Sequence, residues 1–302
     1  MIVFQVFNSI ILPIAIIVTI GSVLKLWKKT PSDGISQTVL YIFSPALVFT
    51  GIGSSSMPLG KISEIVFFTL LLTIIMFVIS RIISLILKLD DATKSAFILC
   101  VIFMNSGNLG LSLVLLTFGQ QALDQSLVFF STQAMLNSTI GIYIASRGTQ
   151  GITESLKAVA KQPLLYAAIL GFVVNALGIT PIEPLQQSTK MLAEATIPCM
   201  LIVLGFQLSN QIRINNLGTI LIAVFLRLVV CTLVSIPLLQ MFGFSDISRN
   251  AILIQASTPP AVVITILTNE FNSRPDFAAN TVVIGTLLGL PTLTGLLAIL
   301  SN

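Results

Sequence analysis

Ten long apolar runs follow one another along this sequence of 302 residues and decide what it can fold into. They lie near residues 3–24, 36–55, 64–87, 92–118, 124–146, 161–178, 189–209, 215–241, 247–270 and 276–300. A helix needs roughly 20 apolar residues to cross a bilayer core of about 30 Å, so each run predicts one membrane-spanning helix. Charged residues are only 9% of the chain, too few to cover a water-facing surface. The sequence therefore predicts an all-α, multi-pass membrane protein embedded in a lipid bilayer.

The residue types also exclude several functions. Histidine is absent, so Ser–His or Cys–His nucleophile pairs, His-ligated zinc and imidazole-held haem are excluded. Cys100, Cys199 and Cys231 lie far apart in apolar runs and predict buried side chains rather than a metal site. A net charge of +4 is too small for an electrostatic nucleic-acid binder. We expect no enzyme activity, no metal, no cofactor and no nucleic-acid partner.

The basic residues predict the orientation of the spans, because cytoplasmic loops carry an excess of Lys and Arg. Most of the 15 basic residues follow odd-numbered spans, namely Lys25, Lys28, Lys29, Arg81, Lys88, Lys94, Arg147, Lys157, Lys161, Arg213 and Arg274. Those that follow even-numbered spans are Lys61, Lys190 and Arg249. The odd joints are therefore expected in the cytoplasm and both termini on the extracytoplasmic side.

The two halves of the sequence resemble each other. Pro45 in the second span recurs as Pro198 in the seventh, roughly 150 residues later, and segment 91–96 recurs at 246–251 with a similar offset. Because each half holds an odd number of spans, the second copy must enter the membrane upside down. The expected domains are a five-helix repeat, a cytoplasmic linker and an inverted five-helix repeat, at residues 1–147, 148–160 and 161–302.

Polar residues and prolines interrupt two of the spans near the centre of the membrane. The interrupting residues are Asn105, Ser106, Gly107 and Asn108 in the fourth span, and Thr258, Pro259, Pro260 and Ala261 in the ninth. Both groups lie about 20 Å from the start of their span. Proline has no N–H to donate, so the carbonyls before it lose their helical partners, which is costly at that depth. We predict two broken helices that cross at mid-membrane.

The crossing predicts a binding site. Because the two spans enter from opposite sides, the second half of each begins at the centre, with its positive dipole end and free N–H groups there. Such a centre favours an anion, typically a carboxylate, bound by the eight interrupting residues with Asn105 and Asn108 as neutral donors. Gln133 and Asn137 share one face of the fifth span and are further candidates, although interhelical hydrogen bonding explains many such stripes.

Two charged residues inside apolar runs have two interpretations each. Arg227 lies near the centre of the eighth span, where a charge costs about 2.5–3.5 kcal/mol or more. It either balances the charge of a substrate or clamps backbone carbonyls. Glu194, one turn before Pro198, either carries a coupling proton or extends to the outer interface. Pro45, Pro198 and Pro291 are expected to kink their helices.

Several motifs resemble those of the auxin efflux carrier family, which includes plant PIN-type carriers and bacterial organic-acid carriers. The block 105–112 is similar to the fourth-helix motif of that family, 256–261 with 269–271 to its ninth, and 279–287 with Pro291 to its tenth. The likeness extends over essentially the whole chain. The lack of a long central loop is typical of the short microbial branch.

The resemblance implies a ten-helix fold like that of bile-acid symporters and NhaA-type antiporters. In that fold, spans 1, 2, 6 and 7 form a scaffold, and a transport core of spans 3–5 and 8–10 moves against it by an elevator mechanism. It also implies secondary active or facilitative transport of a small organic anion, such as auxin, malate or malonate, across the plasma membrane. H⁺ or Na⁺ is the candidate coupling ion, and related carriers suggest a homodimer.

Two alternatives stay open. One is a sodium-coupled symporter of larger amphipathic anions, which shares the same fold and would differ in the dependence of uptake on sodium. The other is a membrane receptor that transports nothing, although a receptor does not require two broken helices at the midplane.

Overall fold

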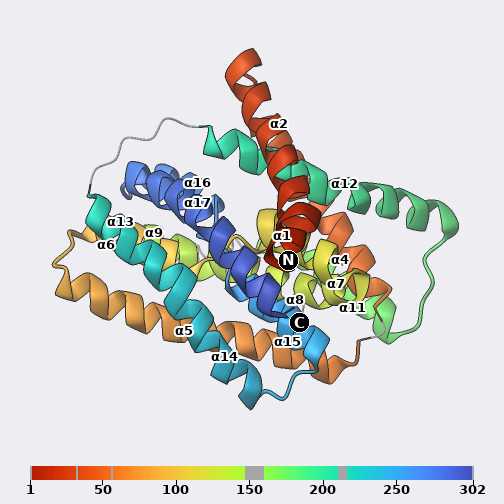
Figure 1. The fold of residues 1–302 in the computed structure, drawn as a ribbon. Coiled ribbons are helices and arrows are strands. Elements are labelled where there is room, and N and C mark those ends of the chain that lie inside the picture. Colours follow the sequence, from red (N-terminus) through yellow and green to blue (C-terminus); the bar gives the residue numbers. More distant parts are fainter. Residues whose placement is uncertain (1, 32, 56, 147–159, 210–215, 301–302) are drawn as a thin grey trace.

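The computed structural model describes residues 2–31, 33–55, 57–146, 160–209 and 216–300 (Figure 1). Within these ranges the chain is helical, apart from connecting turns and one isolated β-bridge. The predicted linker 148–160 lies outside the described residues except for Ala160, and Arg147, Lys157 and Arg213 lie outside them as well.

The first half contains five helical segments, several of them with a π-helical turn (η) in their course. They are α1 (Ile2–Val6), η1 (Phe7–Ile11) and α2 (Leu12–Lys28); α3 (Asp33–Thr38), η2 (Val39–Phe43) and α4 (Ser44–Gly53); α5 (Leu59–Ile86); α6 (Asp91–Ile102), η3 (Ser106–Leu111) and α7 (Ser112–Phe118); and α8 (Gln120–Leu136), η4 (Asn137–Gly141) and α9 (Ile142–Ala145).

The second half follows a similar order. Its elements are α11 (Pro163–Ala176); α12 (Glu183–Leu208); α13 (Leu217–Phe225), η5 (Leu226–Val230) and α14 (Cys231–Met241); α15 (Asp246–Ala256) and α16 (Val263–Glu270); and α17 (Pro275–Leu300). Proline near the first position of α11 and α12 sets the backbone angle with which a helix begins. Acidic residues in the first turns of α15 and α17 complement the positive end of the helix dipole.

Three helices extend a few residues beyond the predicted apolar runs, because charged residues are accommodated at their ends. The first span continues to Lys28, since a cation in the last turn interacts favourably with the helix dipole. The third span begins at Leu59, and its first turns include an ion pair of Lys61 with Glu64 at 2.8 Å. The seventh begins at Glu183 rather than 189, because Pro184 and an acidic first turn favour a helix start there.

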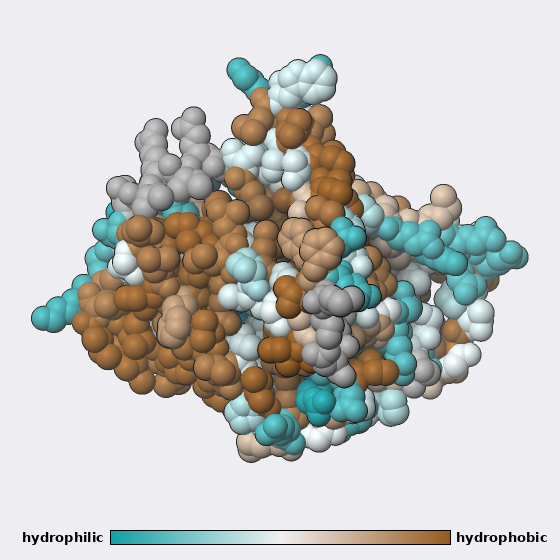
Figure 2. Space-filling view, viewed as in Figure 1, coloured by the Kyte–Doolittle hydropathy of each residue, from teal (hydrophilic) through white to brown (hydrophobic). Residues whose placement is uncertain are grey.

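Seven helical stretches in the described residues are long and apolar enough to cross a membrane. They are Val3–Lys28, Gly34–Gly53, Gly60–Ile86, Gln120–Ala145, Glu183–Leu208, Leu217–Met241 and Pro275–Leu300. The other three predicted spans are shorter helices, since 92–118 and 247–270 are each divided in two and α11 is short. Apolar side chains such as Phe67 and Leu233 point outward, and Figure 2 shows a broad apolar surface with hydrophilic residues gathered at its periphery.

The helices α2, α4, α11 and α12 pack against one another through glycines. A Cβ added to Gly205 of α12 would overlap the carbonyl oxygen of Val18 on α2, and one added to Gly171 of α11 would lie 2.9 Å from that of Phe49 on α4. The hydroxyl of Ser22 also donates to the Gly205 carbonyl at 2.8 Å. Glycine at these positions allows the backbones to approach closely, as in many membrane helix pairs.

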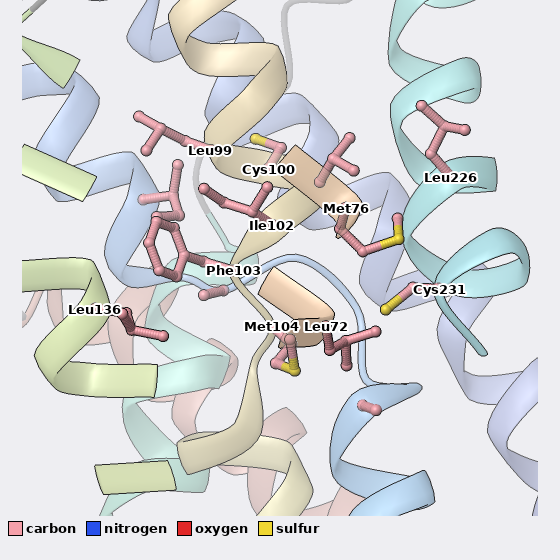
Figure 3. Packing of buried hydrophobic residues seen from close by; sticks show 14 of the residues in the cluster. Leu72, Met76, Leu99, Cys100, Ile102, Phe103, Met104, Leu136, Leu226 and Cys231 are labelled. Atoms are coloured by element: carbon pink, nitrogen blue, oxygen red, sulfur yellow. The ribbon is translucent and has the colours of Figure 1, made fainter. Parts of the chain in front are cut away.

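A second packing group surrounds the largest apolar core. Its buried side chains come from α5, α6, α8, α9, α13, η5, α14, α15, α16 and α17, and Phe68 of α5 is fully buried against Phe129 of α8 and Phe242 after α14. Figure 3 shows the part of this core around Met76, Ile102 and Phe103. We call this set the core group and the set α2, α4, α11 and α12 the glycine-packed group.

We expect Gly205→Ala to destabilise the protein by about 1–3 kcal/mol, because the new methyl group meets the backbone of α2, which cannot rotate away. The midpoint of thermal unfolding in detergent measures this. Gly295→Ala is the matched control on α17, since a Cβ there meets nothing within 4 Å. Equal midpoints for the two variants would contradict the close approach of α2 and α12.

Candidate functional site

The fourth predicted span breaks after Ile102. Phe103 is extended, with φ −104° and ψ 126°, and Figure 3 shows the helix giving way to an extended segment at Phe103 and Met104. Asn105 follows with φ −75° and ψ 53°, and the N–H of Ser106 donates to the Met104 carbonyl at 2.7 Å. These angles and this hydrogen bond define an inverse γ-turn, after which η3 begins.

The ninth predicted span breaks after Ala256 and resumes at Val263. The tandem prolines supply no N–H, so the carbonyl oxygens before them need other donors. The Gln255 carbonyl accepts from the hydroxyl of Thr258 at 2.8 Å. The Ala256 carbonyl accepts from Nη2 of Arg227. Both carbonyls that the sequence predicts to lose their helical partners have therefore gained side-chain donors.

The two breaks cross and pair with each other. The N–H of Asn105 donates to the Pro259 carbonyl at 2.8 Å, and the N–H of Ala261 donates to the Phe103 carbonyl at 3.0 Å. Met104 and Pro260 form an antiparallel β-bridge between these hydrogen bonds. Each break thus satisfies backbone groups that the other leaves free, which a membrane interior requires.

The exact place of the first break differs from the prediction. Ser106, Gly107, Asn108 and Gly110 lie inside η3, not in the interruption, which is confined to the residues before them. The two glycines serve close contacts instead. A Cβ added to Gly107 would lie 2.8 Å from Cε2 of Phe130, and one added to Gly110 would overlap the side-chain amide of Gln255.

Helix α17 packs against the other break. Gly285 faces the ring of Pro260, where an added Cβ would lie 2.6 Å from Cδ, and Gly289 faces Pro259, with Cβ at 3.4 Å. The spacing of these two glycines predicts close helix packing in general, but their partner, the tandem prolines, is not visible in the sequence.

Arg227 is fully buried in η5 and joins both breaks. Its Nη1 donates to the Val101 carbonyl at 3.0 Å, and its Nη2 donates to the Ala256 carbonyl and to the Cys231 sulfur at 2.8 Å. Val101 and Ala256 belong to the last turns of α6 and α15, where unpaired carbonyls carry negative partial charge. These contacts agree with the interpretation in which Arg227 clamps backbone carbonyls.

Polar side chains surround the crossing. Asn105 is 4% exposed, and its Nδ2 has no hydrogen-bond partner among the described residues. Gln133 donates from Nε2 to the hydroxyl of Thr73 at 3.1 Å. The Thr73 hydroxyl donates its own hydrogen bond to the Thr69 carbonyl, so it can only accept from Gln133. Oε1 of Gln133 therefore needs another donor, and none of the described residues supplies one. Asn137, the next candidate, begins η4 and lies beside Gly141 and Phe103.

The remaining candidate residues are Glu194 and three prolines, and none of them belongs to the two breaks. Glu194 is exposed on α12. Pro198 and Pro291 lie inside α12 and α17, which continue through them, and Pro45 is the second residue of α4, which follows the π-helical turn η2 directly. Gln255, which contacts η3, is not among the candidates predicted from the sequence. Its signal was a polar residue in an apolar run one turn before the tandem prolines.

Several proteins with similar sequences are named as transporters. A family model described as membrane transport protein matches residues 6–297. An uncharacterized transporter of Methanocaldococcus jannaschii is 25% identical over 295 residues, which covers 93% of this chain and 95% of that one. A putative malonate transporter of Rhizobium meliloti is 24% identical over 275 residues, 87% of this chain and 85% of that one. PIN-LIKES 7 of Arabidopsis thaliana is 27% identical over 131 residues, 38% and 33% of the two chains.

The apolar helices and these similarities define a membrane-spanning transporter. The chain belongs to the membrane transport protein family, that of the auxin efflux and PIN-type carriers, and the resemblance identified from the sequence motifs is confirmed.

We expect Arg227→Met to lower the unfolding midpoint strongly, because it leaves two buried carbonyls unsatisfied at a cost of about 1–3 kcal/mol each. Arg227→Lys keeps the charge but lacks the planar fork, so an intermediate midpoint is expected. Arg249→Met is the control, since Arg249 pairs with Asp246 at the surface, where such a pair contributes little. An unchanged midpoint in Arg227→Met would contradict the clamp.

Proposed function

We propose that this protein is a secondary transporter of small organic anions, active or facilitative, and that a carboxylate of the substrate binds where the two broken helices cross. The observation that carries the proposal is the unpaired Nδ2 of Asn105, a donor that is buried beside two helix starts. A buried donor without an acceptor is costly, and a bound acceptor removes that cost.

The backbone adds further donors. The first-turn N–H groups of η3 at Gly107 and Asn108, and those of α16 at Val262 and Val263, have no acceptor within their own helices. The dipoles of both helices favour negative charge at the same ends. The proposed substrate contacts are Asn105, Ser106, Gly107, Asn108, Thr258, Pro259, Pro260 and Ala261, with Gln133 and Asn137 at the side.

The family membership supports small carboxylates as substrates. A relative that aligns over most of both chains bears the name putative malonate transporter, and a plant relative bears the name PIN-LIKES 7. Both malonate and auxin-like compounds are organic acids that carry a carboxylate at neutral pH.

We also propose the full topology of ten spans in two inverted repeats, with both termini on the extracytoplasmic side of the plasma membrane. The similar starts of α6 and α15, each with an aspartate in its first turn, support two copies of one unit. The antiparallel bridge between Met104 and Pro260 supports their opposite orientation.

The proposed mechanism is alternating access by an elevator motion. The glycine-packed group corresponds to the scaffold implied by the family resemblance, and the core group corresponds to the transport core. The crossing lies within the core group, since Phe103, Met104 and Ala261 belong to its apolar cluster. A bound anion would therefore travel with that group relative to the scaffold.

The decisive experiment is uptake of labelled malonate by purified Asn105→Ala protein in liposomes. Uptake is expected to fall to background, because the substituted side chain has no donor, whereas folding is expected to persist because alanine tolerates the backbone angles of Asn105. Asn8→Ala, in η1 where the side chain is exposed, is the control and should transport normally. Full uptake by folded Asn105→Ala would refute the proposed site.

A further inference from the structure

A second side-chain amide at the crossing has no hydrogen-bond partner among the described residues. Gln255 is fully buried on α15, and both Oε1 and Nε2 lack hydrogen-bond partners among the described residues. Most buried side-chain polar atoms in proteins are paired, so an amide with two unpaired ends indicates a missing ligand group.

The position of this amide links it to the substrate site. A Cβ added to Gly110 would overlap Oε1 of Gln255 and lie 3.4 Å from Nε2, so the amide contacts η3 at Gly110 with its oxygen nearer than its nitrogen. The N–H of Gly110 donates to the Asn105 carbonyl at 3.0 Å, which places Gly110 in the turn that follows Asn105. Gln255 therefore borders the same helix start to which the carboxylate is proposed to bind.

In the described part of the chain, the surroundings of Gln255 contain one buried positive charge, the guanidinium of Arg227, which has no carboxylate partner there. Charged or titratable groups on α15 and on the elements packed against it are Asp246, Arg249, Asp124, Cys231, Asp276 and, on η5, Arg227. Asp246 and Arg249 pair with each other at the start of α15, and Asp124 accepts from Gln120 at 2.9 Å. Asp276 is exposed, and the hydrogen bonds of Arg227 go to backbone carbonyls and to Cys231.

This environment limits the charge of the ligand. The single guanidinium of Arg227, the N–H donors and the helix dipoles together balance one negative charge. A second negative charge would exceed this single buried cation, which is far more costly than burying a neutral polar group. A dicarboxylate bound here is therefore expected to carry one proton.

An un-ionised carboxyl group fits the free amide. Nε2 of Gln255 donates to the carbonyl oxygen of the carboxyl group, and its O–H donates to Oε1, so both unpaired atoms gain a partner. An ionised carboxylate only accepts hydrogen bonds and would leave Oε1 facing another oxygen. We propose that the site takes dicarboxylates as hydrogen-dicarboxylate monoanions, with the carboxylate at Asn105 and the un-ionised carboxyl group at Gln255.

This inference rests on the proposed function and adds the protonation state of the substrate. A proton then crosses the membrane as part of the substrate, bound to its own carboxyl oxygen. Proton-linked transport of this kind requires no titrating side chain at the crossing.

The test measures ligand affinity from the thermal stabilisation of the purified protein. The ligands are malonate and malonamate, whose amide reproduces the donor and acceptor of an un-ionised carboxyl group at every pH. Between about pH 7.5 and about pH 6.5 the monoanion fraction of malonate rises about tenfold, so its apparent affinity should rise by the same factor. The affinity for malonamate should not change with pH.

Variants separate the amide from the rest of the site. Gln255→Leu should weaken malonamate at least about tenfold, because the un-ionised group loses both hydrogen bonds, and should leave acetate binding unchanged. Gln207→Leu on α12 removes a glutamine from the glycine-packed group and is the matched control, expected to behave as the unmodified protein.

The outcomes distinguish the two proposals. Malonate affinity that is equal at both pH values, or malonamate binding that Gln255→Leu leaves unchanged, would overturn the monoanion inference while carboxylate binding itself stands. A lack of stabilisation by malonate, malonamate and acetate alike would overturn both.

Discussion

The structure depends on the need to pair every backbone polar group inside a membrane. Two helices stop near the middle of their length, and the groups they free are satisfied by one another, through Asn105 with Pro259 and Phe103 with Ala261. Arg227 then supplies donors to the carbonyls at the ends of α6 and α15. With these needs met inside the protein, the donors that remain at the two helix starts are available to a ligand.

The same division bears on the proposed anion site, where the buried guanidinium of Arg227 already donates to the ends of α6 and α15. A guanidinium that already donates to carbonyls and a sulfur contributes a field but few further hydrogen bonds. In the proposed site, selection depends on neutral groups, Asn105 Nδ2 and the Gln255 amide, which respond to the donor and acceptor pattern of a solute as well as to its charge. Neutral amides also keep this pattern at every physiological pH.

The sequence predicted the existence and the approximate position of both breaks, because tandem prolines and clustered amides act locally on the backbone. It could not predict that η3 includes Gly107 and Gly110, since these glycines face Phe130 and Gln255 from other helices. The two interpretations of Arg227 also depended on tertiary contacts: Val101 and Ala256 are far from it in sequence but adjacent in space. The sequence therefore predicts effects that a residue has on its own backbone, but not the contact partners that come from distant segments.

The glycines of α17 have a consequence for the energy of ligand capture. Gly285 and Gly289 pack against the rings of Pro260 and Pro259, so α17 supports the break between α15 and α16. The contacts of the protein itself hold the bend, so a solute bound at the proposed site would not have to spend its affinity on ordering the chain. With a bulkier residue at either glycine, the proline ring could no longer pack there. Each solute that binds would then have to order the bend itself and would bind more weakly.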